Sequence, residues 1–251
     1  MRRLISSLFA LALGCSLVVP AVADSFNPEQ KKDLEKLIHS YLVEHPEVLS
    51  EVAAALDAKE KKAAEEQRGT FLSSAAKDLF HDNMDAVVGN PKGDITVVEF
   101  MDYNCGWCRK SIKEMQALVG SDKNVRVVMK EFPIFGEGSE YAARAAMASV
   151  KQGKYWPFHQ ALFATEGKVT PEIVDQVATQ QGLDLAKLKT DMNDPAIAAN
   201  IAKTVQLAES LQLTGTPGFI VDTKVFPGYV PQDALSMAIA TARANGGCKI
   251  C

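Results

Sequence analysis

The stretch from residue 95 to residue 112, ITVVEFMDYNCGWCRKSI, constrains this chain more than any other. It begins with an apolar, largely β-branched run, which is typical of a buried strand. A polar break follows, and then the motif from Cys105 to Cys108 opens a segment whose apolar residues recur at helical spacing. We expect Asn104 to cap that helix, because asparagine is a favoured N-cap residue. The pattern predicts a strand, a turn and a helix with two cysteines in its first turn.

That placement has a chemical consequence for both cysteines. Cys105 would lie where free backbone N–H groups and the helix dipole stabilise a thiolate. Cys108 follows one turn later, close enough to form a disulfide with it. An attacking thiolate with a resolving partner is the minimum equipment for thiol–disulfide exchange. A CxxC pair also occurs in zinc and iron–sulfur sites and as a static disulfide, but the strand–turn–helix context favours redox chemistry.

Residues 1–23 have the features of a secretory signal peptide. Two arginines precede an apolar run, and an Ala-Val-Ala cleavage site ends at Ala23. The apolar run is short for a membrane span. The Leu-Gly-Cys sequence ending at Cys15 offers an alternative lipoprotein site, which would place the protein at the outer membrane. We therefore expect export to a bacterial periplasm.

The composition argues against two classes of protein, nucleic-acid-binding proteins and disulfide scaffolds. Loss of the two signal-peptide arginines takes the net charge from −4 to −6, and this acidic balance argues against nucleic-acid binding. The cysteines that remain form two CxxC pairs, too few for a disulfide scaffold in a chain long enough to bury a core. The four histidines are scattered. We expect no metal and no cofactor.

Residues 24–70 are predicted to be a helical segment with its connector. Asn27-Pro28 opens the first helix, since asparagine caps well and proline fits the first turn. Pro46 interrupts it, and a second helix follows. Each helix has an apolar stripe, but residues 27–56 are too few to enclose a core. Because the polar connector 57–68 would hold them away from the rest, self-association is favoured over a lid folded back on the main domain.

Residues 71–247 are predicted to form the main domain. A second strand (125–132) follows the CxxC helix, and then comes an almost wholly helical block, about 136–212. The chain ends with a Thr-Pro turn, two short strands and a last helix. This order is that of an α/β thioredoxin fold that carries a helical insertion. Residues 248–251 form a separate tail.

From residue 95 to residue 244 the chain resembles the DsbA family of exported thiol–disulfide oxidoreductases. Residues 39–49, HSYLVEHPEVL, resemble the oligomerisation segment of ScsC-like members. The segments FPIFG and SLQLTGTP resemble those of Com-type DsbA homologues. The resemblance implies that Cys105 is the exposed nucleophile, that Cys108 is the more buried resolving thiol, and that Cys105–Cys108 is the redox-active disulfide.

The resemblance also assigns the loop opposite the cysteines. Thr216-Pro217 would be the family's cis-proline loop, whose free backbone pairs with an extended substrate segment. Proline there also keeps a metal from bridging the cysteines. Threonine before the proline resembles the isomerase and reductase branches. Gly106 and Trp107 would contact substrate and tune the redox potential. Since the strongly oxidising members carry Pro-His between their cysteines, we expect a less oxidising pair here.

Glu99 is the third candidate catalytic residue. Alternation along the strand places it on the opposite face from Val98 and Phe100, and it matches the family's buried acid beneath the resolving cysteine. Burial would raise its pKa and let it accept the Cys108 proton. The alternative is a glutamate on a solvated sheet face.

The tail from Cys248 to Cys251 departs from the family pattern. Three interpretations stay open: a second redox pair that exchanges with Cys105–Cys108, a clamp for Cu(I), or an inert terminal disulfide.

The resulting functional hypothesis is disulfide exchange in secreted proteins, with isomerase or reductase character. The partners expected are unfolded or mispaired secreted proteins, a membrane redox partner of the DsbB or DsbD/ScsB type, and further copies of the chain in a dimer or trimer. The alternatives are a DsbA-type oxidase, a copper-binding tolerance module, and a structural protein with a vestigial fold.

Overall fold

The computed structural model describes residues 26–251, so the expected signal peptide and Cys15 lie outside the described residues. The chain divides into two units, one up to Glu60 and one from Lys61 onwards. The expected boundary at residue 70 falls inside a continuous helix, α2 (Glu47–Ser74). Among the helices described, none combines the length and apolarity that a bilayer crossing requires.

The first unit consists of α1 (Pro28–Glu44) and the start of α2. A capping box opens α1: the Asn27 side chain accepts from the Gln30 N–H at 2.8 Å, and the Gln30 side chain accepts from the Asn27 N–H at 2.9 Å. The helix ends before Pro46, as the sequence predicts. No residue of α1 is buried, and its apolar side chains, such as Leu37 (64% exposed), face solvent. This stripe has no partner within the described chain.

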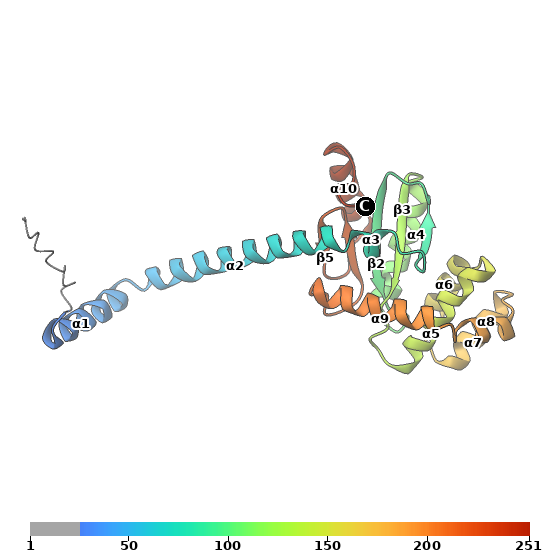
Figure 1. Ribbon diagram of the computed structural model, residues 1–251, viewed down its shortest axis with the longest axis horizontal. Helices are drawn as coiled ribbons and strands as arrows, with labels where there is room; N and C mark the ends of the chain where they lie inside the picture. The colour runs from blue at the N-terminus through green and yellow to red at the C-terminus, as the bar shows by residue number, and fades with distance from the viewer. Residues whose placement is uncertain (1–25) are drawn as a thin grey trace, which may run out of the picture. The chain divides into compact units, whose positions relative to one another are not determined.

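The second unit is built around a five-stranded sheet with the order β1-β3-β2-β4-β5 (Figure 1). Only the central pair, β2 and β3, is parallel. The strands are β1 (Ala86–Gly89), β2 (Ile95–Met101), β3 (Val125–Glu131), β4 (Gly218–Val221) and β5 (Lys224–Phe226). Every residue of β2 is buried. β1 is the one strand that the sequence analysis missed.

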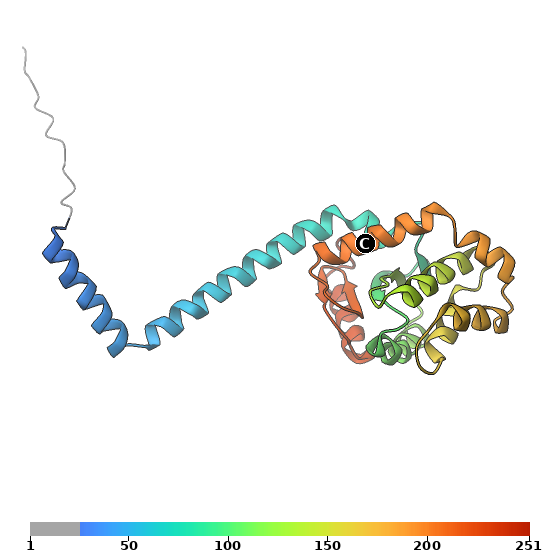
Figure 2. The same ribbon diagram turned by 90° about the horizontal axis from the view of Figure 1, so that it is seen from below.

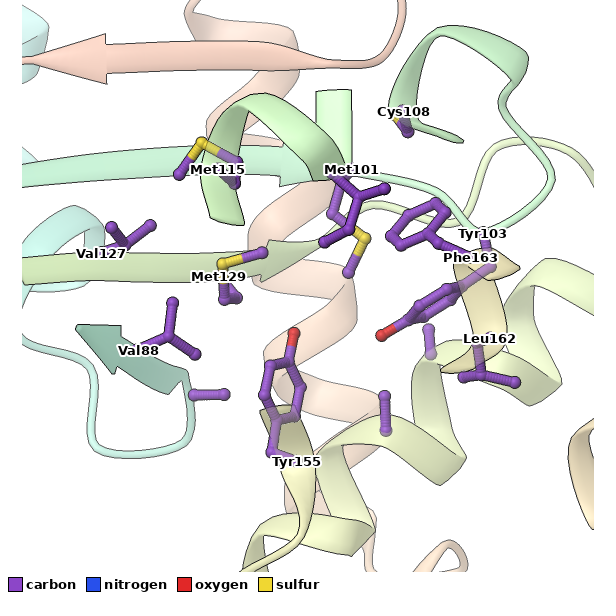
Figure 3. Packing of buried hydrophobic residues seen from close by; sticks show 14 of the residues in the cluster. Val88, Met101, Tyr103, Cys108, Met115, Val127, Met129, Tyr155, Leu162 and Phe163 are labelled. Atoms are coloured by element: carbon purple, nitrogen blue, oxygen red, sulfur yellow. The ribbon is translucent and has the colours of Figure 1, made fainter. Parts of the chain in front are cut away.

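Helices cover both faces of this sheet. On one face, α4 (Gly106–Ser121) and α10 (Gln232–Ala244) share a core with Val97 and Met101 of β2. Figure 3 shows part of this core, in which Met101 and Tyr103 pack against Phe163. On the other face, Val98 and Phe100 pack against α3 (Ala76–Phe80), the end of α2 and α9 (Pro195–Ser210). Successive residues of β2 therefore serve opposite cores, as the two-residue period of a strand requires.

The predicted helical block lies between β3 and β4 and is confirmed. It contains α5 (Glu137–Ser149), a 3₁₀ turn (Val150–Gln152), α6 (Tyr155–Ala164), α7 (Pro171–Gln180), α8 (Leu185–Asp191) and α9 (Pro195–Ser210). Figures 1 and 2 show α6, α7 and α8 grouped on the opposite side of the unit from β5. α5 is rich in buried alanines, and Gly138 is required there because a Cβ would lie 2.4 Å from the Val169 carbonyl oxygen. Small residues thus let α5 approach its neighbours closely.

Candidate active site

The CxxC motif lies where β2 ends and α4 begins. Cys105, not Asn104, is the N-cap of α4, and its Sγ accepts from the Cys108 N–H at 3.4 Å. The predicted cap is wrong because the Asn104 side chain is already occupied: its amide donates to Ser139 and to the Val169 carbonyl, and its oxygen accepts from the Val169 N–H. Asn104 therefore ties the CxxC turn to the helical insertion.

Asp102, which the sequence analysis passed over, organises the same turn. One carboxylate oxygen accepts from the Asn104 N–H and the Ser139 hydroxyl, both at 2.7 Å. The other accepts from the N–H groups of Ile134 (2.7 Å) and Phe135 (3.0 Å). This buried carboxylate thereby fixes the FPIFG loop and α5 against the CxxC turn. A polar residue directly after a buried strand was the available signal.

The cis-proline loop meets Cys105 across the fold. The peptide bond between Thr216 and Pro217 is cis, and Cys105 Sγ lies 3.1 Å from the Thr216 carbonyl oxygen. The structure thus brings together the predicted cysteine and the predicted loop. The intervening dipeptide of the motif is exposed, and nothing lies within 4 Å of where a Gly106 Cβ would be. This side of the motif is open to a substrate.

The two cysteines have opposite protonation preferences. A hydrogen bond from the Cys108 thiol lowers the pKa of Cys105 to about 6, against the opposing effect of burial, with help from Thr216 and from backbone N–H groups. Burial raises the pKa of Cys108, and its hydrogen bond to Cys105 raises it further. Cys105 is therefore a thiolate at neutral pH while Cys108 keeps its proton. Both are free thiols here, so the disulfide between them stays a prediction for the oxidised form.

Glu99 lies beneath the first turns of α4. It is 3% exposed, which excludes the solvated alternative, and one carboxyl oxygen accepts from Ser111 Oγ at 3.4 Å. The other oxygen has no hydrogen-bond partner among the described residues. Burial raises the pKa of Glu99 to about 8, and its charge contributes to the raised pKa of Cys108. A carboxyl group with this pKa can exchange a proton with a nearby thiol near neutral pH.

An aromatic pair flanks the motif. Trp107 is 58% exposed, its ring centroid is 5.5 Å from that of Tyr229, and Lys110 Nζ lies over both rings. Tyr229 is held by its hydroxyl, which donates to Glu114 at 2.7 Å. Exposed aromatic surface of this kind can bind an unfolded polypeptide. Tyr229 follows a turn far along the chain, so spacing alone could not place it here.

The aromatic side chains of α6 contribute to packing. Tyr155 and His159 are buried, and burial lowers the pKa of His159 to about 3, so its ring is neutral. Two tyrosines that contact the His159 ring, Tyr103 and Tyr155, donate to Glu131, and burial raises the pKa of Glu131. Within residues 26–251, no three side chains of the His, Cys, Asp or Glu type are grouped as metal ligands would be.

A cysteine poised as a thiolate in the first turn of a helix, a buried partner thiol and a cis-proline loop opposite define a thiol–disulfide oxidoreductase with the thioredoxin fold. Family models agree with this class. Residues 96–240 match the DSBA-like thioredoxin domain, and residues 30–63 match the copper resistance protein ScsC N-terminal domain. The chain therefore belongs to the DSBA-like thioredoxin family and carries an ScsC-type N-terminal segment.

Solved structures resemble this chain closely. A thioredoxin-like oxidoreductase from Silicibacter pomeroyi is 48% identical, covers 67% of this chain and 97% of its own, and has a TM-score of 0.66. BcfH from Salmonella enterica Typhimurium is 29% identical, covers 86% of this chain and 96% of its own, and has a TM-score of 0.71. The match to BcfH covers more of the chain than the second unit, from Lys61 onwards, contains.

Two kinds of curated relative each match somewhat less than two thirds of this chain. The Na(+)/H(+) antiporter NhaA 3 of Salinispora tropica is 30% identical over 163 residues, and this chain spans only about a quarter (25%) of that protein's length. The disulfide bond formation protein D of Bacillus subtilis is 26% identical over 165 residues, which cover 61% of this chain and 74% of that protein.

Proposed function

We propose that this protein is a periplasmic thiol–disulfide oxidoreductase that reduces or isomerises disulfides in secreted proteins. The observation that carries this proposal is the environment of Cys105, a thiolate at neutral pH that faces the Thr216 loop. The Thr216 hydroxyl is buried and has no hydrogen-bond partner among the described residues, so it is free to donate to a thiolate. The thiolate is the form of Cys105 that attacks a mispaired disulfide.

The isomerase cycle follows from the two protonation states. The Cys105 thiolate attacks one sulfur of a substrate disulfide, which forms a mixed disulfide and releases the other substrate sulfur as a thiolate. That thiolate attacks a different disulfide of the substrate, and the rearranged chain finally displaces Cys105. If the intermediate stalls, Cys108 loses its proton to Glu99 and attacks Cys105, which frees the substrate in reduced form.

The dipeptide between the cysteines supports a less oxidising pair than that of a dedicated oxidase. Gly106 has no side chain, and the Trp107 ring packs on Tyr229, so neither supplies a cationic donor to the Cys105 thiolate. A thiolate with fewer stabilising donors makes the disulfide harder to reduce and the protein a weaker oxidant. An oxidase is the alternative, and a redox potential at the level of the strong oxidants would favour it.

The N-terminal segment is proposed to join several catalytic units. α1 buries none of its own residues and exposes Leu34, Leu37, Ile38 and Tyr41 along one stripe. A second copy of this helix is the occupant that fits, because an unpaired amphipathic helix gains stability by burying its apolar stripe. The match of residues 30–63 to the ScsC N-terminal domain supports this proposal.

Redox partners and location complete the proposal. An isomerase must be kept reduced, so a membrane electron donor of the DsbD/ScsB type is expected rather than a DsbB-type oxidant. Periplasmic export rests on the signal-peptide pattern at residues 1–23. Copper binding is the second candidate because of the matched family's name, but residues 30–63 contain no cysteine. Copper stoichiometry on the reduced protein tests that candidate directly.

Recovery of a scrambled multi-disulfide enzyme tests the proposal. The wild-type chain should restore activity, and Leu37→Glu, which places a charge in the apolar stripe, should lower the yield while leaving simple disulfide reduction intact. His39→Glu is the matched control, because it adds the same charge to α1 outside the stripe. If Leu37→Glu unscrambles as well as wild type, oligomerisation is not needed; if the wild type only oxidises reduced substrate, the protein is an oxidase.

A further inference from the structure

The C-terminal tail is docked on the catalytic unit, where Figure 1 marks the end of the chain. Cys248 and Cys251 form a disulfide. Cys248 packs against the core on one face of the sheet, while Ile250 and Cys251 pack against the core on the other. Both cysteines are only half-buried, so an attacking thiol can reach them.

Asp222 holds the tail in place. This residue lies in the turn between β4 and β5, is 9% exposed, and accepts a 2.7 Å hydrogen bond from the Lys249 N–H. The same carboxylate oxygen lies 3.6 Å from Cys248 Sγ. The backbone N–H of Cys251 donates to Cys248 Sγ at 3.1 Å.

The two CxxC pairs share a local arrangement. In each, the backbone N–H of the second cysteine donates to the sulfur of the first, at 3.4 Å in the active-site pair and 3.1 Å in the tail. They differ in what else faces that sulfur. Cys105 lies at the start of α4, whereas Cys248 has no helix after it and faces the Asp222 carboxylate.

That difference sets the direction of electron transfer. A carboxylate beside Cys248 repels its thiolate, whereas the helix N-terminus stabilises the thiolate of Cys105. A disulfide whose reduced form is less stabilised is harder to reduce. The tail disulfide is therefore the more stable of the two, and a reduced tail donates electrons to an oxidised active site.

The sheet register places the docked tail and Cys105 of the same chain at opposite ends of β2. Asp222 follows Val221, which pairs with Val97 of β2, whereas Cys105 lies beyond Met101 at the other end of that strand. Four residues of strand separate the two ends by roughly 13 Å. The docked tail thus lies far from the active site of its own chain.

We propose that Cys248 and Cys251 form a second thiol–disulfide site, which passes two electrons to the Cys105–Cys108 disulfide of another copy of this chain. This inference rests on the proposed function, since it assumes that Cys105–Cys108 exchanges disulfides. A tail thiolate attacks Cys105 Sγ, and the bond to Cys108 breaks to release the Cys108 thiolate. The second tail thiolate then attacks the tail sulfur of the mixed disulfide, which closes the tail disulfide and expels the Cys105 thiolate. One proton of the tail dithiol ends on Cys108 and the other passes to solvent, because Cys105 stays a thiolate at neutral pH, so the tail is oxidised and the active site is reduced.

Two full-length variants test this transfer. Cys105→Ser/Cys108→Ser, reduced, carries only the tail pair; Cys248→Ser/Cys251→Ser, oxidised, carries only the active-site pair. After equimolar mixing, acid quenching and alkylation, mass spectrometry should find most of the disulfide between Cys248 and Cys251 of the Cys105→Ser/Cys108→Ser variant. Absence of transfer, or an equilibrium with most of the disulfide left in the active site, overturns the proposal.

Asp222→Asn, added to the Cys105→Ser/Cys108→Ser variant, tests whether the Asp222 charge affects the equilibrium of this transfer. If the tail has only a structural role, this substitution should not change that equilibrium. Removal of the Asp222 charge should lower the equilibrium constant for transfer by about threefold or more, because solvent partly screens this charge from the half-buried Cys248 sulfur. Glu209→Gln, at an exposed position of α9, should leave it unchanged. An unchanged constant in Asp222→Asn contradicts the assigned direction. Reduction of a simple disulfide by Cys248→Ser/Cys251→Ser tests the proposed function separately, because that variant keeps the whole active site.

Discussion

Cys105 Sγ lies 3.1 Å from the carbonyl oxygen of Thr216, although 111 residues separate the two in sequence. The contact joins the first turn of α4 to the loop that leads into β4. It places the reactive sulfur beside backbone that is free to pair with an extended substrate segment. The proposed nucleophile and the proposed substrate-binding loop are therefore parts of one site.

Alkylation of Cys105 should follow a pKa of about 6. The pKa of this thiol is lowered, so the thiolate fraction and the rate rise as the pH increases through 6 and level off above it. Iodoacetamide kinetics on reduced Cys248→Ser/Cys251→Ser measure this, since burial keeps the only other cysteine of the described chain, Cys108, protonated and unreactive. A midpoint near the ordinary thiol value would mean that Cys105 is not activated.

Thr216→Val should raise the pKa of Cys105. The Thr216 side chain contributes to the lowered pKa, and its hydroxyl has no other partner among the described residues. Alkylation at pH 6 should slow several-fold, while the rate at high pH, where every Cys105 is a thiolate, should not change. Thr214→Val is the matched control because Thr214 is exposed two residues earlier. If the two variants show the same pH dependence of alkylation, Thr216 does not lower the pKa of Cys105.

Glu99→Gln should stabilise the reduced protein against unfolding at neutral pH. The folded-state pKa is raised from 4.5 to about 8, so the stabilising effect of the neutral form is complete below pH 4.5 and is lost as the pH rises towards 8. At pH 7 the free energy of unfolding of Glu99→Gln should exceed that of the wild type by about 3 kcal/mol at most. Denaturant unfolding at pH 5 and pH 7 measures it, with the exposed Glu209→Gln as control.

The same variant should slow the escape from stalled mixed disulfides, since Cys108 loses its proposed base. The rate of substrate release after a single turnover reports this step. A variant that is more stable but releases substrate at the wild-type rate would leave Glu99 without a catalytic role.

Trp107→Ala should weaken the reaction with polypeptide disulfides and spare the reaction with glutathione disulfide. Loss of an exposed aromatic contact of this size should cost on the order of tenfold in kcat/KM for the larger substrate, about 1.4 kcal/mol. Tyr229→Phe keeps the ring beside Trp107 but loses the hydrogen bond to Glu114, so its effect should be smaller. Equal losses on both substrates would place Trp107 in the chemistry of the cysteines instead.

Local signals predicted much of the fold. The capping box at Asn27, the break at Pro46 and the strand–CxxC–helix order each depend on neighbouring residues, and all three are present in the structure. β1 was missed because its four residues, AVVG, are too few to show alternation. Its existence depends on pairing with β3, a contact between distant parts of the chain.

The parts of the site that the sequence did not predict also depend on contacts between distant parts of the chain. Asn104 is a good cap by composition, yet its side chain binds Ser139 and Val169, which no local pattern reveals. Tyr229 reaches Trp107 because the loop between β5 and α10 passes beside α4. The division of the chain into domains and the catalytic roles of the site residues stay predictions.

Covalent trapping tests the central claim most directly. The Cys108→Ala variant, with the tail cysteines changed to serine, should attack an oxidised polypeptide. It should stay joined to it when acid quenching stops the released substrate thiol from attacking the mixed disulfide, because the variant has no resolving cysteine of its own. We expect a mixed disulfide that peptide mapping places at Cys105, and none from the matching Cys105→Ala variant. Failure of the first variant to form this adduct, or equal adducts from both variants, would contradict the assignment of Cys105 as the nucleophile.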